Sequence, residues 1–468
     1  MTDSSLPPGP RAPSLQQLYA WTYRPTELLE RCHARYGDMF TLRLPAFPPM
    51  VVVARPDDVK QVFSADSDAF AAGAANSMLK ATLGEHSLLL LDGARHDLER
   101  KLILPAFTGE RLASYGEIMR AAAREVFCND ALNAWGTPRE LFSLHGPMKQ
   151  ITMAVIMRAM FGQSPGDGLS EVPRLLDACL KVANSPAFVT LVDASGEIRG
   201  RAWQERTRWS PWSRFRQQRA RLDAVLLAEI ARRRAVAAER TDVMSLLMTM
   251  HDEAGRALDD AAIRDHMLSL LVAAHRTTAG ALTWTMYWML REPAVHRRVR
   301  EELAGGSSDY LSLAIKEALR LSPPLAVVLR RVMSPQQVGS YLLPASVLVA
   351  PSSYLVHRRA DCWDEPARFQ PERFRTRINP YVYFPFGGGT RRCIGMAFAL
   401  YEMNIVLSEL LSAVSLELKP GYRPRTVRKG ITFVISDGLP VRRLPHTAAT
   451  VVAPSREAAT PAVGAPAD

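Results

Sequence analysis

One cysteine stands in a sequence context that could hold a metal. Cys393 lies directly before an apolar helical pattern, in the run Phe386-Gly387-Gly388-Gly389-Thr390-Arg391-Arg392-Cys393-Ile394-Gly395. Near a helix N-terminus, free backbone N–H groups and the helix dipole favour the thiolate form that binds metals. The glycines let the backbone pass close to a flat ligand. Because one cysteine supplies one ligand, zinc and iron–sulfur sites, which need several, fit poorly.

An isolated cysteine is more often a buried core residue, but three glycines and two arginines make a poor core segment. The decapeptide resembles the haem-binding signature of cytochromes P-450, Phe-x-x-Gly-x-Arg-x-Cys-x-Gly. All five fixed positions match, at Phe386, Gly389, Arg391, Cys393 and Gly395. The resemblance implies haem b (iron protoporphyrin IX), with the Cys393 thiolate on the iron, where its electron donation favours O–O cleavage.

The resemblance assigns a role to one charged pair. Glu317 and Arg320 are three residues apart and share a helix face. Such a pair is usually exposed and contributes less than ~1 kcal/mol. In cytochromes P-450, however, a Glu-x-x-Arg pair and a later arginine form a buried network on the proximal side of the haem. Arg373, in Pro-Glu-Arg-Phe, stands where that later arginine is expected.

Four cationic residues are candidates for the haem propionates. His96 and Arg100 are four residues apart, so one helix face can present both to the same anion; a solvated surface is the alternative. The family uses a His-x-x-x-Arg pair for the propionates, together with the arginine of the cysteine loop, here Arg391. A further arginine follows the Glu-x-x-Arg helix, and Arg330 fits this place better than Arg331. Several cationic donors balance two carboxylates.

The central helix is predicted to start at the Asp259–Asp260 cap and to end at Arg291, a length of about 48 Å. It is apolar nearly all round and therefore buried, yet Ala273-Ala274-His275-Arg276-Thr277-Thr278 lies in its middle. Polar groups there need partners or a ligand. The stretch resembles the family's oxygen-binding sequence, Ala-Gly-x-acid-Thr. Thr277 matches the threonine that assists protonation, whereas Ala274 replaces the glycine and Arg276 replaces the acid.

Three interpretations of Arg276 remain open. The favoured one pairs Arg276 with a carboxylate such as Asp193 or Glu197, reversing the usual polarity. In the second, Arg276 binds a substrate carboxylate, as in family members that use peroxide on fatty acids, although those lack the adjacent threonine. In the third, protons pass through water and Thr277 alone. A haem-binding partner or sensor that no longer turns over is a further alternative.

The resemblance places the substrate among apolar segments, although ordinary core packing is the alternative for each residue. Their character suits a fatty acid, terpenoid, steroid or polyketide. The candidate pocket residues are Ala273, Val327, Val328 and Phe433.

The net charge of +11 and the isoelectric point near 9.6 suit an acidic partner. Residues 199–221 contain eight arginines and three tryptophans, a mixture that also occurs in nucleic-acid binders. We do not favour nucleic acid, because the resemblance places the lid of the substrate channel there. Arg391, Arg392 and Lys101 are expected on the proximal side, where an acidic ferredoxin or a flavodoxin, served by its reductase, would deliver electrons.

The periodicity predicts a mainly α protein with a smaller β-rich part, and the resemblance implies the cytochrome P-450 fold with haem between the central helix and the cysteine-loop helix. The predicted helices are 111–127, 222–237, 260–291, 310–321 and 396–411. The predicted strands are 40–44, 50–54, 346–349 and 431–436. A Pro-rich lead (1–12) and an Ala/Pro-rich tail (446–468), both expected to be loose, flank a single catalytic domain (13–445).

The five scattered cysteines do not suggest a disulfide framework and favour a reducing cytoplasm. Only six residues precede Pro7, too few for a signal peptide or anchor. The apolar stretch 267–290 carries His275 and Arg276 near its middle, where charge is expensive in a bilayer. We therefore expect a cytoplasmic, bacterial-type monomer without a membrane span.

Overall fold

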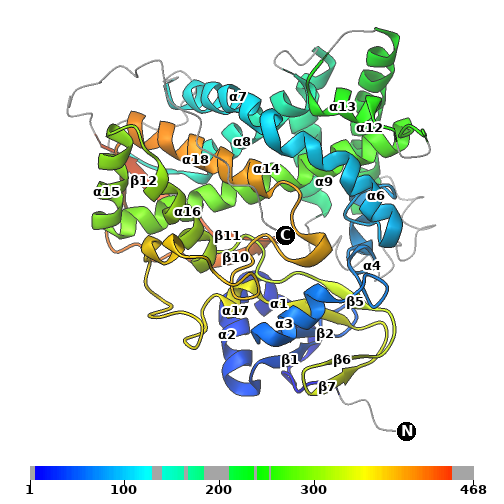
Figure 1. Cartoon of the computed structure of the whole chain (residues 1–468), viewed down its shortest axis with the longest axis vertical. Coiled ribbons are helices and arrows are strands. Elements are labelled where there is room, and N and C mark those ends of the chain that lie inside the picture. The colour runs from blue at the N-terminus through cyan, green and yellow to red at the C-terminus, as the bar shows by residue number, and fades with distance from the viewer. Residues whose placement is uncertain are drawn as a thin grey trace.

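The structure is a computed structural model that describes residues 6–128, 140–162, 167–183, 210–236, 240–251 and 255–444. Long helices form the larger part of the molecule, and several of the short strands form a smaller part beside it with helices α1 to α3 (Figure 1). The predicted fold class, mainly α with a smaller β-rich part, is confirmed.

The larger part is built from eight long helices of the described chain. They are α7 (Gly109–Cys128), α8 (His145–Phe161), α9 (Val172–Ala183), α12 (Pro211–Ala235), α14 (Asp260–Arg291), α15 (Pro293–Ala304), α16 (Asp309–Leu321) and α18 (Met396–Ala413). The central helix α14 has the predicted bounds. The Asp259 carboxylate accepts a hydrogen bond of 2.7 Å from the Ala262 N–H and so caps it, and Pro293 begins the next helix.

The other helices surround the strands and connect the elements of the larger part. They are α1 (Ser14–Tyr23), α2 (Pro25–Tyr36), α3 (Pro56–Ser64), α4 (Ala72–Ala75), α5 (Lys80–Leu83), α6 (Gly93–Ile103), α13 (Val243–Thr249) and α17 (Ser353–Val356).

The main sheet joins strands from residues 39–71 with strands from residues 330–351, in the order β1-β2-β8-β5-β3. Strand β2 pairs in parallel with β8, and the other neighbours are antiparallel. Its strands are β1 (Met39–Leu42), β2 (Met50–Val53), β3 (Phe70–Ala71), β5 (Arg330–Val332) and β8 (Leu348–Pro351). The smaller sheets are β10 (Thr426–Lys429) with β11 (Thr432–Ile435), β4 (Leu141–Ser143) with β12 (Pro440–Arg443) and β9 (Leu416–Leu418), and β6 (Gln336–Val338) with β7 (Tyr341–Leu343).

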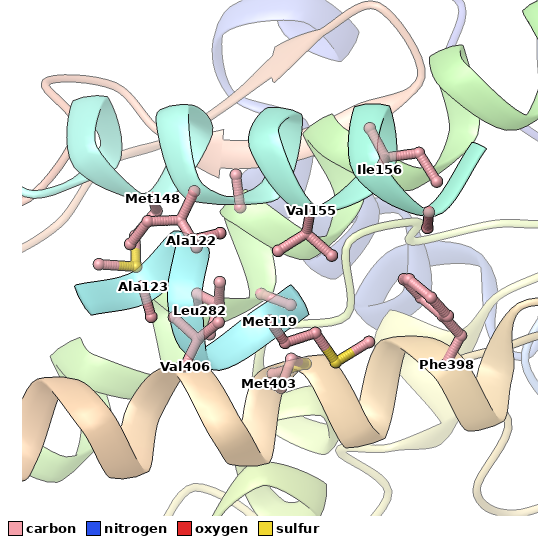
Figure 2. Packing of buried hydrophobic residues seen from close by; sticks show 14 of the residues in the cluster. Met119, Ala122, Ala123, Met148, Val155, Ile156, Leu282, Phe398, Met403 and Val406 are labelled. Carbon is pink, nitrogen blue, oxygen red and sulfur yellow. The ribbon is translucent and has the colours of Figure 1, made fainter. Parts of the chain in front are cut away.

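Figure 2 shows the core between α7, α8, α14 and α18. Side chains from all four helices meet there, among them Met119, Val155, Leu282 and Met403. Each of these four residues is at most 1% exposed. Helix α14 carries Thr277, and α18 follows Cys393. This packing fixes the two helices relative to one another.

Two sequence-based expectations need correction. The Pro-rich lead is not loose at residues 7–9: the Thr41 hydroxyl and N–H donate hydrogen bonds of 2.7 and 2.9 Å to the carbonyls of Pro7 and Pro8. Helix α12 begins at Pro211 rather than 222, because the Ser210 hydroxyl caps it and proline suits its first turn. Within the basic stretch, Trp212 is buried and stacks on Phe215 at 5.6 Å, as a core residue does. Residues 446–468 lie outside the described chain.

In the described residues, α18 is long and apolar enough to cross a membrane by length and composition. It packs against α7, α16 and α14 and carries Glu402, which is 2% exposed. These contacts are those of a core helix.

Candidate functional site

The cysteine loop is closed by its own backbone. The Cys393 N–H donates a hydrogen bond of 2.9 Å to the Phe386 carbonyl. Gly389 has a φ of +67°, and a Cβ there would lie 2.2 Å from the Phe63 carbonyl oxygen, so only glycine fits. Gly395 immediately precedes α18, and a Cβ added to it would meet no atom within 4 Å. The loop therefore packs tightly on Phe63 and leaves open space beside Gly395.

Cys393 is accessible to solvent, yet the surrounding protein raises the pKa of its thiol by burial. The Gly395 N–H and the charges of Arg100 and Arg392 lower this pKa but do not outweigh burial. The sequence-based expectation of a lowered pKa is therefore wrong for the chain alone. The thiolate needs the positive charge of a bound metal, because a metal ligand must be deprotonated.

Two arginines lie close together here, Arg391 within the cysteine loop and Arg330 beside it. Arg391 donates a hydrogen bond of 2.5 Å to the Asp92 carboxylate and another to the Leu91 carbonyl. Arg330, on β5, is buried and donates to the carbonyls of Leu329 at 2.9 Å and Gly388 at 3.4 Å. Burial, with a smaller effect of Arg391, lowers the pKa of Arg330 to about 10. Arg330, which the sequence favoured over Arg331, is thus the arginine that lies near Arg391.

Helix α6 adds His96 and Arg100 to this cationic group. His96 is 2% exposed, with Nδ1 2.9 Å from the Asp97 carboxylate. Burial lowers the pKa of His96, and the charges of Arg391 and Arg100 lower it further. Burial also lowers the pKa of Arg100. The charge of Arg100 in turn lowers the pKa of the Cys393 thiol.

Positive charge therefore exceeds negative charge around Cys393. The cationic cluster is defined as the guanidiniums of Arg100, Arg330 and Arg391 together with the adjoining imidazole of His96, whose lowered pKa disfavours its charged form. The carboxylates that act on it are chiefly Asp92 and Asp97. Three partly desolvated guanidiniums are costly unless anions meet them. The donor set suits a ligand with two carboxylates beside a metal held by Cys393, which is the chemistry of haem.

The middle of α14 exposes one face. Ala273 is exposed, Ala274 and Thr277 are half-buried, and His275 is fully buried on another side of the helix. The Thr277 hydroxyl donates a hydrogen bond of 2.5 Å to the Ala273 carbonyl. His275 Nδ1 lies 2.8 Å from the Leu271 carbonyl oxygen, and burial lowers the pKa of His275 to about 4, so it stays neutral.

Arg276 pairs with Asp177 on α9, with its Nη2 3.6 Å from the carboxylate. Lys149 on α8 approaches the same carboxylate at 3.3 Å. Arg276 therefore has a carboxylate partner, as expected. The sequence did not indicate that this partner is Asp177. Asp193 and Glu197 lie outside the described residues. No local signal marks Asp177, because the contact joins two separate helices.

The family model described as cytochrome P-450 matches residues 5–438. The chain belongs to the cytochrome P-450 family. It is 35% identical over 470 residues to the putative cytochrome P-450 135B1 of Mycobacterium tuberculosis, covering 98% of this chain and 96% of the relative. It is 32% identical over 448 residues to the putative cytochrome P-450 135A1 of the same species, covering 95% and 96%.

Solved structures agree in fold. The retinoic acid-bound cyanobacterial CYP120A1 has a TM-score of 0.78 at 22% identity, covering 94% of this chain and 99% of that one. The cytochrome P-450 CYP102L1 has a TM-score of 0.76 at 24% identity, covering 95% and 100%. The protein is thus a haem-thiolate monooxygenase that uses O₂ and a substrate, with a haem cofactor.

This cytochrome P-450 contains a fully buried charged network on α16. Glu317 and Arg320 are both 0% exposed and form a two-point ion pair at 2.7 and 2.8 Å. Arg373 approaches Glu317 at 3.1 Å. Arg320 also donates to the carbonyls of His357, Pro366 and Arg368. The planar guanidinium thus joins α16 to His357 and to residues 366–368.

The four candidate pocket residues do not share one environment. Ala273 lies on the accessible face of α14, and Val328 lies beside the cysteine loop, 3.7 Å from a Cβ built on Gly387. Val327 packs at the edge of the cluster that contains Phe433. The Phe433 ring lies against Trp21 of α1, with ring centres 5.9 Å apart. Its neighbour Val434 faces α14 instead, near Gly280.

Proposed function

We propose that this cytochrome P-450 binds haem b and hydroxylates a hydrophobic small molecule of the fatty acid, terpenoid, steroid or polyketide type. Its electrons would come from a ferredoxin or flavodoxin with its reductase. The observation that carries the proposal is the cationic cluster beside the accessible Cys393 thiol. The bound haem supplies oxygen activation, and the chain supplies the ligand, the anchors and the protons.

Cys393 would hold the iron, and the cationic cluster would hold the two propionates through charge-assisted hydrogen bonds. Phe386, Gly389 and Gly395 would shape the loop that approaches the ring. The network of Glu317, Arg320 and Arg373 would keep the proximal segments in place. Ala273, Val327 and Val328 would contact the substrate, with Phe433 in a more remote position.

Thr277 would orient and pass protons. Its hydroxyl donates to the Ala273 carbonyl, so the oxygen keeps acceptor capacity for water. Arg276 has no acceptor atom and lies against Asp177. Protons therefore reach Thr277 through water, while Arg276 positions α14 against α9.

Replacing Thr277 by valine should lower product formed per electron pair by about tenfold and raise hydrogen peroxide release, because the proton-passing hydroxyl is lost while water remains. Thr277→Ser should retain most coupling. The matched control is Thr285→Val on the same helix, whose hydroxyl makes an equivalent 2.8 Å bond to the Ala281 carbonyl. Unchanged coupling in Thr277→Val would remove Thr277 from the proton path.

Peroxide-driven oxidation of fatty acids is the second candidate. The 3.6 Å separation of Arg276 from Asp177 exceeds hydrogen-bond length, and Arg276 is 25% exposed. Because Lys149 shares Asp177, a substrate carboxylate could take its place beside Arg276. A haem-binding sensor without turnover is the third candidate, and no contact favours it over the other two.

Spin-state titration with fatty acids, terpenes and steroids should first identify a substrate, followed by turnover with either electron source. We expect product with a ferredoxin and its reductase and little with hydrogen peroxide alone. The reverse result would establish the peroxide route, and Arg276→Ala should then weaken binding of the carboxylate substrate. Failure with both sources for every tight-binding compound would favour the sensor.

We further propose that residues 13–445 form one catalytic domain that works as a monomer in a bacterial cytoplasm, without nucleic acid. Cys32, Cys179, Cys362 and Cys393 are free thiols, which supports a reducing compartment. Arg392 and Lys101 are exposed and remain proposed contacts for an acidic electron donor. The Arg391 side chain is only 9% exposed and pairs with Asp92, so we no longer propose it as such a contact.

A further inference from the structure

A cavity of about 590 Å³ lies at the C-terminal end of α14. Its lining comes from α14, the start of α2, the end of α16, α17, residues 418–426 and Phe433. Val434 contacts α14 near Gly280, between Thr277 and the first lining residue of that helix, Trp284. Strand β11 therefore crosses α14 between the cavity and the face that carries Thr277.

The walls of this cavity are aromatic. Trp284, Tyr287 and Trp288 follow one another along α14 and are 4 to 9% exposed. The Tyr287 ring centre lies 5.7 Å from Trp284, 5.1 Å from Trp288 and 6.4 Å from Tyr422. Tyr354 and Phe433 complete the aromatic set. Such walls suit a flat apolar body, and the volume is within the ordinary range for small-molecule sites.

The charge of the cavity is positive. Its lining contains Arg291, Arg358 and Arg423 and no Asp or Glu. Arg291 and Arg423 are exposed and lie at the mouth. Arg358 stacks on Tyr354 at 3.8 Å and donates to the carbonyls of Leu321 and Tyr354.

These guanidiniums are only weakly neutralised within the described chain. Arg358 and Arg423 have no carboxylate within ion-pair distance there, and Arg291 has one only at 4.0 Å, from its exposed neighbour Glu292. The acidic groups behind the walls already accept hydrogen bonds: Glu30 from Tyr354 and Asp437 from Tyr422. A ligand anion would therefore meet an excess of positive charge at the mouth.

We propose that this cavity is a second small-molecule site, separate from the haem site, that binds a flat aromatic carboxylate. The ring would lie against the aromatic side chains that line the cavity, and the carboxylate would meet Arg291 and Arg423 at the mouth. A neutral molecule of the same shape would keep the aromatic contacts and lose the charged ones.

Calorimetric titration of the haem-loaded protein, with imidazole on the iron, provides the test. The probes are 1-naphthoate and its neutral analogue 1-naphthamide. We expect one saturable naphthoate site per chain, binding of the amide about tenfold weaker, and no change in the haem absorption spectrum. The double variant Arg291→Gln/Arg423→Gln should weaken naphthoate about tenfold. Thr426→Trp should block binding by filling the cavity.

The matched control is Arg31→Gln/Arg120→Gln, which removes two charges from the exposed pairs with Glu27 and Glu117 and should leave naphthoate affinity unchanged. Equal affinity for acid and amide would overturn the proposal. So would the absence of a saturable site, or naphthoate binding that survives both the double variant and Thr426→Trp.

Discussion

Cys393→Ser should abolish the thiolate-type Soret band of the reduced protein exposed to carbon monoxide. A serine hydroxyl has a far higher pKa than a thiol and does not replace the thiolate on the iron. Monooxygenase turnover should fall by more than about 100-fold, equivalent to about 2.7 kcal/mol of activation barrier. Difference spectra and product formation at equal haem content measure both effects.

Cys362→Ser is the matched control, because Cys362 is also a partly accessible free thiol but lies far along the chain from the loop. It should keep the band and the turnover. A Cys393→Ser protein that retained the thiolate-type band would refute the assignment of the iron ligand, as would a histidine-type band in the unaltered protein.

Glu317→Gln should destabilise the fold by about 3–5 kcal/mol, because it leaves the Arg320 guanidinium buried without its counter-ion. Arg373 would lose its partner in the same step. We expect a lower urea midpoint, an unchanged m-value and reduced haem retention. Arg320→Lys should also destabilise, because one ammonium group does not reproduce contacts to a carboxylate and three carbonyls.

Glu27→Gln provides the comparison. It removes a carboxylate that pairs with Arg31 at 3.1 Å, but both side chains are about half exposed or more, so the cost should be about 0.3–0.5 kcal/mol. If Glu317→Gln cost no more than this control, the buried network would contribute no more than an exposed pair does.

The sequence specified the site where its signals were local. Helix α14 was predicted to the residue because a capping aspartate and a following proline mark its ends. The cysteine loop was predicted because all its fixed positions lie within ten residues. Glu317 and Arg320 were paired correctly because their spacing places them on one helix face.

Features built from distant segments were missed. The partner of Arg276 is on α9, and nothing near Asp177 in the chain indicates the contact. The start of α12 was hidden by a run of arginines, although Ser210 and Pro211 form a recognisable helix start. The aromatic cavity draws its lining from several separated segments, so no single stretch of sequence reveals it. The pKa of Cys393 depends on burial, which spacing does not encode.

The pairing of Arg276 with Asp177 also restricts how this chain could have changed during evolution. Placing the family's usual acid at position 276 would set two carboxylates against each other, with Lys149 left between them. Replacing Asp177 by a cationic residue at the same time would restore an attractive ion pair of reversed polarity. The two positions are therefore epistatic, and a close homologue with an acid at 276 is expected to carry lysine or arginine at 177.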